Sequence, residues 1–328
     1  MRTVKQCGAV TSALIALLIG AAPSLALDYP TRPVRIIVPY TPAGAVDLLA
    51  RTLGPRLTEA WGQQIVVDNR PGAGGNLGTE AVAKSPPDGY TLLLSTSTPL
   101  TTNVALYKSL RYDPERDLDA LTLLAESAVF VVANKDLPVK TIADVIALAK
   151  QRSSPLLVGS SGHGTLGHFL TTQISKRAGV DLSHVPYRGG VPAVTAAMTG
   201  EVQLAIIDTV AALPFIGDGR VKGIAASGAK RSSGAPDIPT LSESGIPGLA
   251  MVVWIAAMAP KGTPQDILEK VNTEIQRSLQ NEQFRAGMTR LGLEPVNGMG
   301  LRKFADYVRE EIPRWRKIVE ESGLELQQ

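Results

Sequence analysis

The chain turns from an extended run into a helix within the stretch VRIIVPYTPAGAVD, residues 34–47. Residues 34–38 are rich in β-branched side chains, which is typical of a strand, and a helical pattern over residues 45–60 follows a Pro-Ala-Gly turn. A helix that begins there presents unpaired N–H groups and the positive end of its dipole, so this turn is a candidate anion site. A plain strand-to-helix connection, with Asp47 as an ordinary acidic residue near the helix start, is the alternative interpretation. The candidate residues of this first turn are Tyr40, Thr41, Pro42, Ala43, Gly44 and Asp47.

Short apolar runs alternate with helical patterns along the rest of the chain. Buried apolar strands covered by helices are typical of parallel or mixed sheets, so the sequence predicts the α/β class. The predicted strands are 34–38, 65–67, 91–95, 129–133, 156–158, 184–185 and 204–207, and the further helices are 141–152, 263–281 and 301–322.

Two unusually long extended stretches, residues 121–133 and 249–259, are predicted to cross between two lobes. In that arrangement residues 27–126 and 253–328 form one discontinuous lobe and residues 127–252 form the other. Such a layout leaves a ligand cleft at the crossovers.

The first 26 residues have the pattern of a cleavable secretory signal peptide. Arg2 and Lys5 precede an apolar run over residues 9–22 that is shorter than the roughly 20 residues of a membrane-spanning helix. The small residues Ser24 and Ala26 occupy the positions that signal peptidase reads. The sequence therefore predicts cleavage after Ala26 and a periplasmic protein, with an uncleaved membrane anchor as the alternative.

Composition excludes several classes of partner and site. Removing Arg2 and Lys5 from 33 basic and 30 acidic residues leaves 31 against 30, so no nucleic-acid partner is predicted. The only cysteine, Cys7, lies inside the predicted signal peptide, so the mature chain has no thiol for a disulfide, a nucleophile or a metal.

A second strand-to-helix turn, VGSSGHGT at residues 158–165, repeats the chemistry of the first and adds hydroxyl groups. It resembles an anion-binding nest of backbone amides. It lacks the lysine of a phosphate-binding loop, and His163 stands where a nucleophile elbow around Ser161 would need glycine, so neither a nucleotide nor a nucleophilic serine is predicted. The candidate residues are Ser160, Ser161, Gly162, His163, Gly164 and Thr165.

Two charged residues follow later strands. Arg188 stands beside Gly189 and Gly190, where its guanidinium can fork onto a carboxylate, and an exposed loop cation is the alternative. Asp208 ends a predicted strand, which is where open α/β sheets bind ligands. A glycine-rich loop at residues 70–78 fails the dinucleotide fingerprint because Leu77 replaces its third glycine.

The chain has only three histidines, His163, His168 and His184. No carboxylate pair stands at a zinc-enzyme spacing around them, so no metal site and no cofactor are predicted. Ser161, His184 and Asp208 can in principle form a hydrolytic triad, because triads are defined by geometry. A secreted hydrolase, and a periplasmic sensory module that docks on a sensor kinase, are therefore the alternatives to a binding receptor.

The ordered succession of motifs resembles the Bug family, the solute receptors of tripartite tricarboxylate transporters. The motifs are YPxRPVRIIVP, the Pro-Ala-Gly turn with Asp47, NRPGAGGNLG, DGYTLL and PYRGG, and the resemblance extends from Tyr29 to the last helix. It implies a two-lobed periplasmic-binding-protein (Venus flytrap) fold, each lobe a mixed β-sheet flanked by helices. It also implies a receptor, not an enzyme, that closes on a small organic acid or amino-acid-like ligand and delivers it to membrane permease subunits. A monomer is expected.

The resemblance also implies roles for particular residues. Backbone amides of both turns, often through ordered waters, hold a ligand carboxylate, and Asp47 braces the first turn. Thr96 to Thr101, Arg188 and Asp208 line the variable part of the pocket. Ala43 departs from the commoner glycine of the family, and His163 adds a donor whose charge changes near neutral pH.

Overall fold

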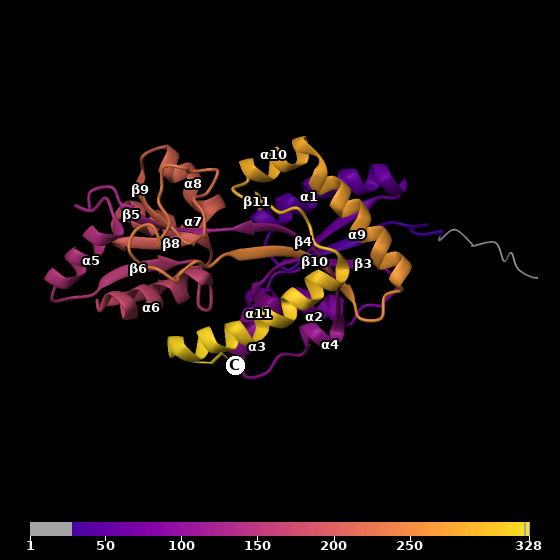
Figure 1. The fold of residues 1–328 in the computed structure, drawn as a ribbon, viewed down its shortest axis with the longest axis horizontal. Coiled ribbons are helices and arrows are strands. Elements are labelled where there is room, and N and C mark those ends of the chain that lie inside the picture. The colour runs from indigo at the N-terminus through magenta and orange to yellow at the C-terminus, as the bar shows by residue number, and fades with distance from the viewer. Residues whose placement is uncertain (1–27, 325, 328) are drawn as a thin grey trace, which may run out of the picture.

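The structure is a computed structural model that describes residues 28–324, 326 and 327. The predicted signal peptide lies outside the described residues. Two lobes lie side by side along the long axis, each with one mixed sheet and helices on its faces (Figure 1). This arrangement confirms the predicted α/β class and the two-lobed fold. Within the described residues, no helix has the length and apolarity needed to cross a membrane.

The first lobe, here called the six-stranded lobe, has the strand order β11-β4-β10-β3-β1-β2. β1 is parallel to β2 and β3, and β10 is antiparallel to β3 and β4. Its strands are β1 (Val34–Val38), β2 (Ile65–Asn69), β3 (Thr91–Thr96), β4 (Leu118–Ser127), β10 (Val253–Pro260) and β11 (Glu294–Pro295). Its helices are α1 (Ala45–Trp61), α2 (Asn76–Ala83), α3 (Asn103–Leu106), α4 (Pro114–Asp117), α9 (Gln265–Gln280) and α10 (Glu282–Arg290), with short helical turns η1 (Ala73–Gly75) and η2 (Thr98–Thr102).

The second lobe, the five-stranded lobe, has the order β7-β6-β8-β5-β9. β6 is parallel to β7 and β8, whereas β5 is antiparallel to β8 and β9. Its strands are β5 (Val129–Asn134), β6 (Leu156–Ser160), β7 (Leu182–Pro186), β8 (Leu204–Asp208) and β9 (Val221–Ala226). Its helices are α5 (Ile142–Gln151), α6 (Leu166–Ala178), α7 (Gly190–Thr199) and α8 (Thr209–Gly217).

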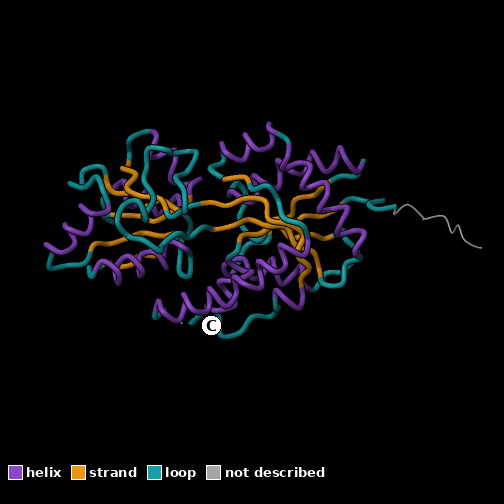
Figure 2. Tube along the Cα trace, viewed as in Figure 1, coloured by secondary structure: helices purple, strands orange, loops and turns teal. Residues whose placement is uncertain are grey.

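The chain passes between the sheets at two neighbouring places (Figure 2). Only Ala128 separates β4 in one sheet from β5 in the other. The chain returns to the six-stranded sheet just before β10, where the Met251 amide donates to the Ser227 carbonyl at 2.9 Å. The lobe boundaries near residues 126 and 253 stay a prediction.

The last helix, α11 (Leu301–Ser322), packs on both lobes. Phe304, Val308 and Ile312 belong to a core cluster of the six-stranded lobe, while Trp315 and Val319 pack into a core of the five-stranded lobe. Pro313 lies between these two halves, where proline removes a helix hydrogen bond and favours a bend. The helix therefore connects the lobes alongside the crossing strands, and its Phe304 packs against Trp254 of β10 (Figure 1).

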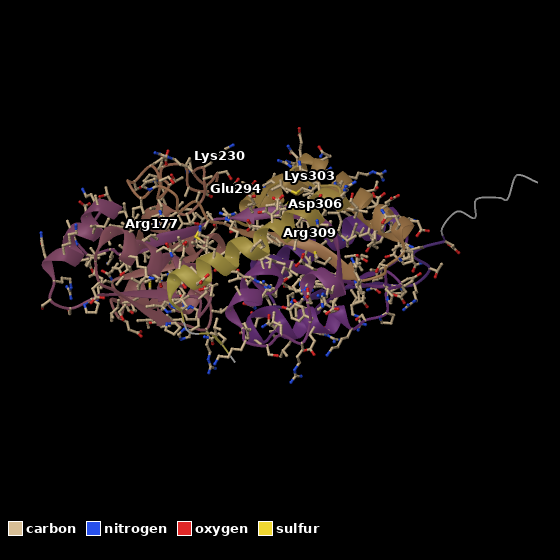
Figure 3. All side chains as sticks on the ribbon, turned by 60° about the horizontal axis from the view of Figure 1, so that its bottom comes forward. Arg177, Lys230, Glu294, Lys303, Asp306 and Arg309 are labelled. Atoms are coloured by element: carbon tan, nitrogen blue, oxygen red, sulfur yellow. The ribbon has the colours of Figure 1, made fainter. Side chains whose placement is uncertain are left out.

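A polar contact joins the lobes near α10. The Glu294 carboxylate of β11 accepts hydrogen bonds from the Ser233 amide at 2.7 Å and from the Ser233 hydroxyl at 2.8 Å. Figure 3 labels Glu294 at the boundary of the lobes, close to the loop that carries Lys230. The loop therefore lies against the opposite lobe.

Candidate functional site

The first turn lies between β1 and α1 and is braced from behind by Asp47. The buried Asp47 carboxylate accepts the Ala43 amide at 2.8 Å and the Arg51 Nε at 3.0 Å. Arg51 also donates to the Asn69 side chain at 3.2 Å, and Asn69 in turn donates to the Tyr40 carbonyl at 3.1 Å. Burial opposes ionisation, but the hydrogen bonds from Arg51 and Ala43 hold the pKa of Asp47 below its usual value. The network fixes the backbone on both sides of the turn.

The turn differs from a simple array of free amides. Ala43 has φ +66°, a left-handed conformation that favours glycine, and its amide points back to Asp47 rather than outward. Within residues 28–324 the amides of Thr41 and Gly44 donate to no protein group. These two amides lie next to the start of α1, whose first amides also lack helix partners, and are available to a ligand.

Tyr40 and Thr96 form the wall beside this turn. The Tyr40 hydroxyl lies 2.5 Å from the Thr96 hydroxyl and 3.4 Å from that of Ser95. Burial raises the pKa of Tyr40, so the phenol stays neutral. A Cβ at Gly75 would lie 3.1 Å from the Tyr40 hydroxyl, which places the glycine-rich loop against the same wall.

The second turn lies between β6 and α6 and is organised around the fully buried Ser160 hydroxyl. That hydroxyl donates to the Gly162 carbonyl at 3.0 Å and accepts the Gly162 amide at 3.1 Å. The Thr165 hydroxyl donates to the same carbonyl at 2.8 Å, and the Gly164 amide donates to His168 Nδ1 at 3.2 Å. In the described part of the chain, the amides of Ser161 and His163 donate to no protein group. The turn therefore also leaves two outward amides, held by neutral groups.

The third segment joins the second turn. The Tyr187 amide donates to the Ser160 carbonyl at 2.9 Å, and the Gly189 amide donates to the Ser161 carbonyl at 3.3 Å. A Cβ at Gly190 would lie 2.7 Å from Asp208 Oδ2 and 3.5 Å from the Ser161 hydroxyl. Glycine at 190 thus allows Ser161 and Asp208 to approach each other.

Asp208 and Arg188 differ in their surroundings. Asp208 caps α8 by accepting the Ala211 amide at 3.0 Å, and burial raises the pKa of its carboxyl group. Arg188 is exposed and forms no ion pair within residues 28–324. The structure brings Asp208 to the second turn, while the Arg188 side chain extends from the segment beside it.

Contacts between the lobes lie on either side of this region. A Cβ at Gly164 would fall 2.1 Å from Leu106 Cδ2, so α3 of the six-stranded lobe presses on the second turn. A Cβ at Gly292 would fall 2.4 Å from Thr209 Cγ2 at the start of α8. Surface hollows of about 310 and 460 Å³ lie elsewhere, and neither is lined by any predicted site residue.

The three histidines converge behind the second turn, which their spacing in the sequence did not predict. His168 and His184 stack with ring centroids 3.8 Å apart, and His163 lies edge-on to both at 5.4 Å. The His184 Nε2 is 2.6 Å from the Ser160 hydroxyl. Burial lowers the pKa of His168 to about 4 and that of His184 to about 3, so both rings are neutral at pH 7. The expectation that no metal site exists was based on the spacing of the histidines in the sequence. Because the three rings meet in the fold, that spacing no longer argues against a metal site.

The family model for the receptor of the tripartite tricarboxylate transporter family matches residues 49–324. The Bordetella pertussis protein BugT is 36% identical over 307 residues, which cover 93% of this chain and 94% of that protein. The solved structure of Rhodopseudomonas palustris Rpa4515 with adipate is 35% identical, with TM-score 0.83, and the match covers 90% of this chain and 98% of that one. MatC from the same species, with bound malate, is 31% identical, with TM-score 0.77 over 89% of this chain and 100% of that one.

Proposed function

Since this chain belongs to the tripartite tricarboxylate transporter receptor family, which comprises solute receptors and not enzymes, we propose that it binds a small aliphatic carboxylate between its lobes. The observation that carries this proposal is the pair of strand-to-helix turns. Each leaves backbone amides at a helix start without a protein acceptor, while other amides of the turn donate to side chains. Amides at helix N-termini suit a carboxylate because they combine donors with the positive end of a dipole.

The ligand class follows from the relatives and from the side chains near the turns. Adipate and malate, bound by two related proteins, are aliphatic dicarboxylates. In this chain one carboxylate is held by the amides of Thr41, Gly44, Ser161 and His163. The exposed Arg188 guanidinium is available for a second carboxylate, and Asp208 and Thr96 set which groups the middle of the ligand carries.

The protein is exported after cleavage of its signal peptide, works in the periplasm as a monomer, and passes its ligand to membrane permease subunits. Ligand binding closes the lobes about the two crossing strands and α11, and the closed form is the one the permease recognises. The contacts of Glu294 with Ser233 and of Gly164 with Leu106 are among the points at which the lobes meet.

A hydrolase is not favoured by the geometry around the serines. The serine beside His184 is Ser160, whose hydroxyl is fully buried and donates to the Gly162 carbonyl. Ser161 lies instead beside Gly190 and Asp208. The triad considered from the sequence is therefore not assembled, and no exposed serine pairs with an imidazole in the described residues.

The experiment is a thermal-shift and calorimetric screen of residues 27–328 against adipate, malate and related acids. A ligand at about 100 times its Kd stabilises the folded protein by about 2.7 kcal/mol. Ser161→Pro removes one outward amide and is expected to weaken binding of any hit by at least about tenfold, a loss of about 1.4 kcal/mol. Ser161→Ala keeps the amide and is the matched control. A folded Ser161→Pro protein with unchanged affinity would refute the anchoring scheme, and failure of every acid would favour the sensory-module alternative.

A further inference from the structure

All three histidines of the chain meet in one cluster that solute binding by backbone amides does not require. His163 belongs to the second turn, His168 to the first turn of α6, and His184 to the middle of β7. The parallel register of β6 and β7, which pairs Val158 with His184, brings β7 alongside the strand that leads into the turn. One nitrogen from each ring lies within 4.8 Å of the others.

We propose that His163, His168 and His184 form a binding site for one divalent transition-metal ion of the zinc, cobalt, nickel or copper class, directly behind the second turn. Imidazole nitrogen is a preferred ligand of these ions. Three protein ligands leave a fourth position open to water, as in zinc sites that bind an exogenous group.

The protonation state of the rings suits a metal. Ligating imidazole must be neutral, and the partial burial of His168 and His184 lowers their pKa values to about 4 and about 3, which keeps both rings uncharged at pH 7. Within residues 28–324 no carboxylate forms an ion pair with any of the three rings. In the described residues, therefore, no acidic side chain stabilises a protonated form of these imidazoles.

The hydrogen bond between His184 and Ser160 decides which nitrogen of the His184 ring is free to bind a metal. Either atom can donate in the 2.6 Å contact between His184 Nε2 and the Ser160 hydroxyl. When Ser160 gives its single hydroxyl proton to the Gly162 carbonyl, His184 Nε2–H is the donor. The lone pair of His184 then lies on Nδ1. Metal-bound histidines typically donate their other N–H to such an outer partner, which orients the ring.

His168 couples the site to the second turn. Its Nδ1 accepts the Gly164 amide at 3.2 Å. A metal either takes this lone pair directly or binds Nε2 and shifts the ring proton to Nδ1. Both routes remove the hydrogen bond from Gly164, so metal binding has to change the backbone environment of the turn.

The rings need small rotations to coordinate one ion. Nitrogens in a tetrahedral zinc site with Zn–N distances near 2.0–2.1 Å lie about 3.4 Å apart, somewhat closer than the 4.8 Å limit observed here. Lone pairs lie in the ring planes, and the planes of His168 and His184 are only 12° apart, so at least one of these rings must turn. His163 is exposed and the other two are half-buried, which leaves room for that movement.

The test uses tag-free residues 27–328, treated with chelator and titrated with Zn²⁺ alone by calorimetry and with Co²⁺ by visible absorbance. We expect one ion per chain. The separate variants His163→Gln, His168→Gln and His184→Gln should each weaken Zn²⁺ binding by at least about tenfold. Asp181→Asn, an exposed carboxylate just before β7, is the matched control and should bind as the parent does. His163→Gln changes an exposed side chain, so its result stays interpretable if the other variants fold poorly.

A second readout follows the Gly164 amide by NMR, because both coordination routes remove its hydrogen bond to His168. Its resonance should move on addition of one equivalent of Zn²⁺. Zn²⁺ affinity unchanged by all three glutamine variants would overturn the proposal, as would absence of stoichiometric binding or a bound ion that leaves the Gly164 resonance unmoved.

Discussion

The two turns proposed to hold the solute are braced by different chemistry. Behind the first, an ionised carboxylate is bonded to a guanidinium and through it to an amide side chain, Asp47 to Arg51 to Asn69. Behind the second, a neutral hydroxyl and neutral imidazoles satisfy the inward amides. A carboxylate with its cation and a set of neutral groups can thus each satisfy the amides that such a turn does not offer to a ligand. The two braces should differ in strength and in their response to pH.

The largest effect is expected from Asp47→Ala in the first turn. It leaves the Ala43 amide without its acceptor and removes both Arg51 contacts, which should lower the free energy of unfolding by about 3 kcal/mol, since hydrogen bonds to charged groups contribute about 1.5–3 kcal/mol. Urea denaturation at pH 7 measures the loss. Arg51→Ala is the control and should cost less than about 1 kcal/mol, because the Arg51 side chain is 51% exposed. If Asp47→Ala and Arg51→Ala lowered the unfolding free energy equally, the ion pair with Arg51, and not the hydrogen bond to Ala43, would be what stabilises the turn.

The charge of the first brace gives it a defined pH response. The folded state lowers the pKa of Asp47, so its ionisation contributes stability above the unfolded value of about 3.9. This contribution is lost as the pH falls below that value through the folded pKa. The difference in unfolding free energy between the parent protein and Asp47→Asn should therefore shrink below about pH 4. A difference that persists at lower pH would show that the charge is not what stabilises the turn.

A somewhat smaller effect is expected from Ser160→Ala in the second turn. The variant leaves the part-buried Gly162 amide without an acceptor, at a cost of about 2 kcal/mol in unfolding free energy. Denaturation at pH 5, 6, 7 and 8 should give the same loss, because the brace carries no charge in that range. Ser161→Ala, which changes a hydroxyl outside this network, should alter stability by less than about 0.5 kcal/mol. If the loss of unfolding free energy in Ser160→Ala varied with pH, the second turn would also depend on a charge, and the two turns would not differ in the way described.

The smallest effect concerns the backbone of the first turn. Ala43→Gly relieves a left-handed residue at φ +66° and should raise the unfolding free energy by about 0.5 kcal/mol, because the gain exceeds the extra freedom of glycine in the unfolded chain. Ala45→Gly, at the first position of α1, is the matched control and should not stabilise. A destabilised Ala43→Gly protein would mean that the turn benefits from the restricted backbone of alanine.

The sequence predicted the first turn more fully than the second. In the first turn, the strand, the Pro-Ala-Gly connection and Asp47 lie within one short stretch, so local pattern and family resemblance together found the brace. In the second turn the brace comes partly from His184, which lies on a different strand, and only the β6–β7 register brings it to Ser160. For the same reason the approach of Asp208 to Ser161 was not predictable: it depends on the missing side chain of Gly190. Leu106 was missed because nothing local marks an apolar residue that touches the other lobe.

The position of β10 in the middle of the six-stranded sheet has a consequence for how the chain folds. Ile255 of β10 pairs with Thr96 of β3 and with Ala125 of β4, so β3 and β4 are not joined in the sheet until most of the chain has been synthesised. The five-stranded sheet uses strands that follow one another without such a gap. Contacts distant in sequence form slowly because a long loop must close first. The lobe that carries the second turn should therefore fold early, and closure of the six-stranded sheet by β10 should be the late step that completes the molecule.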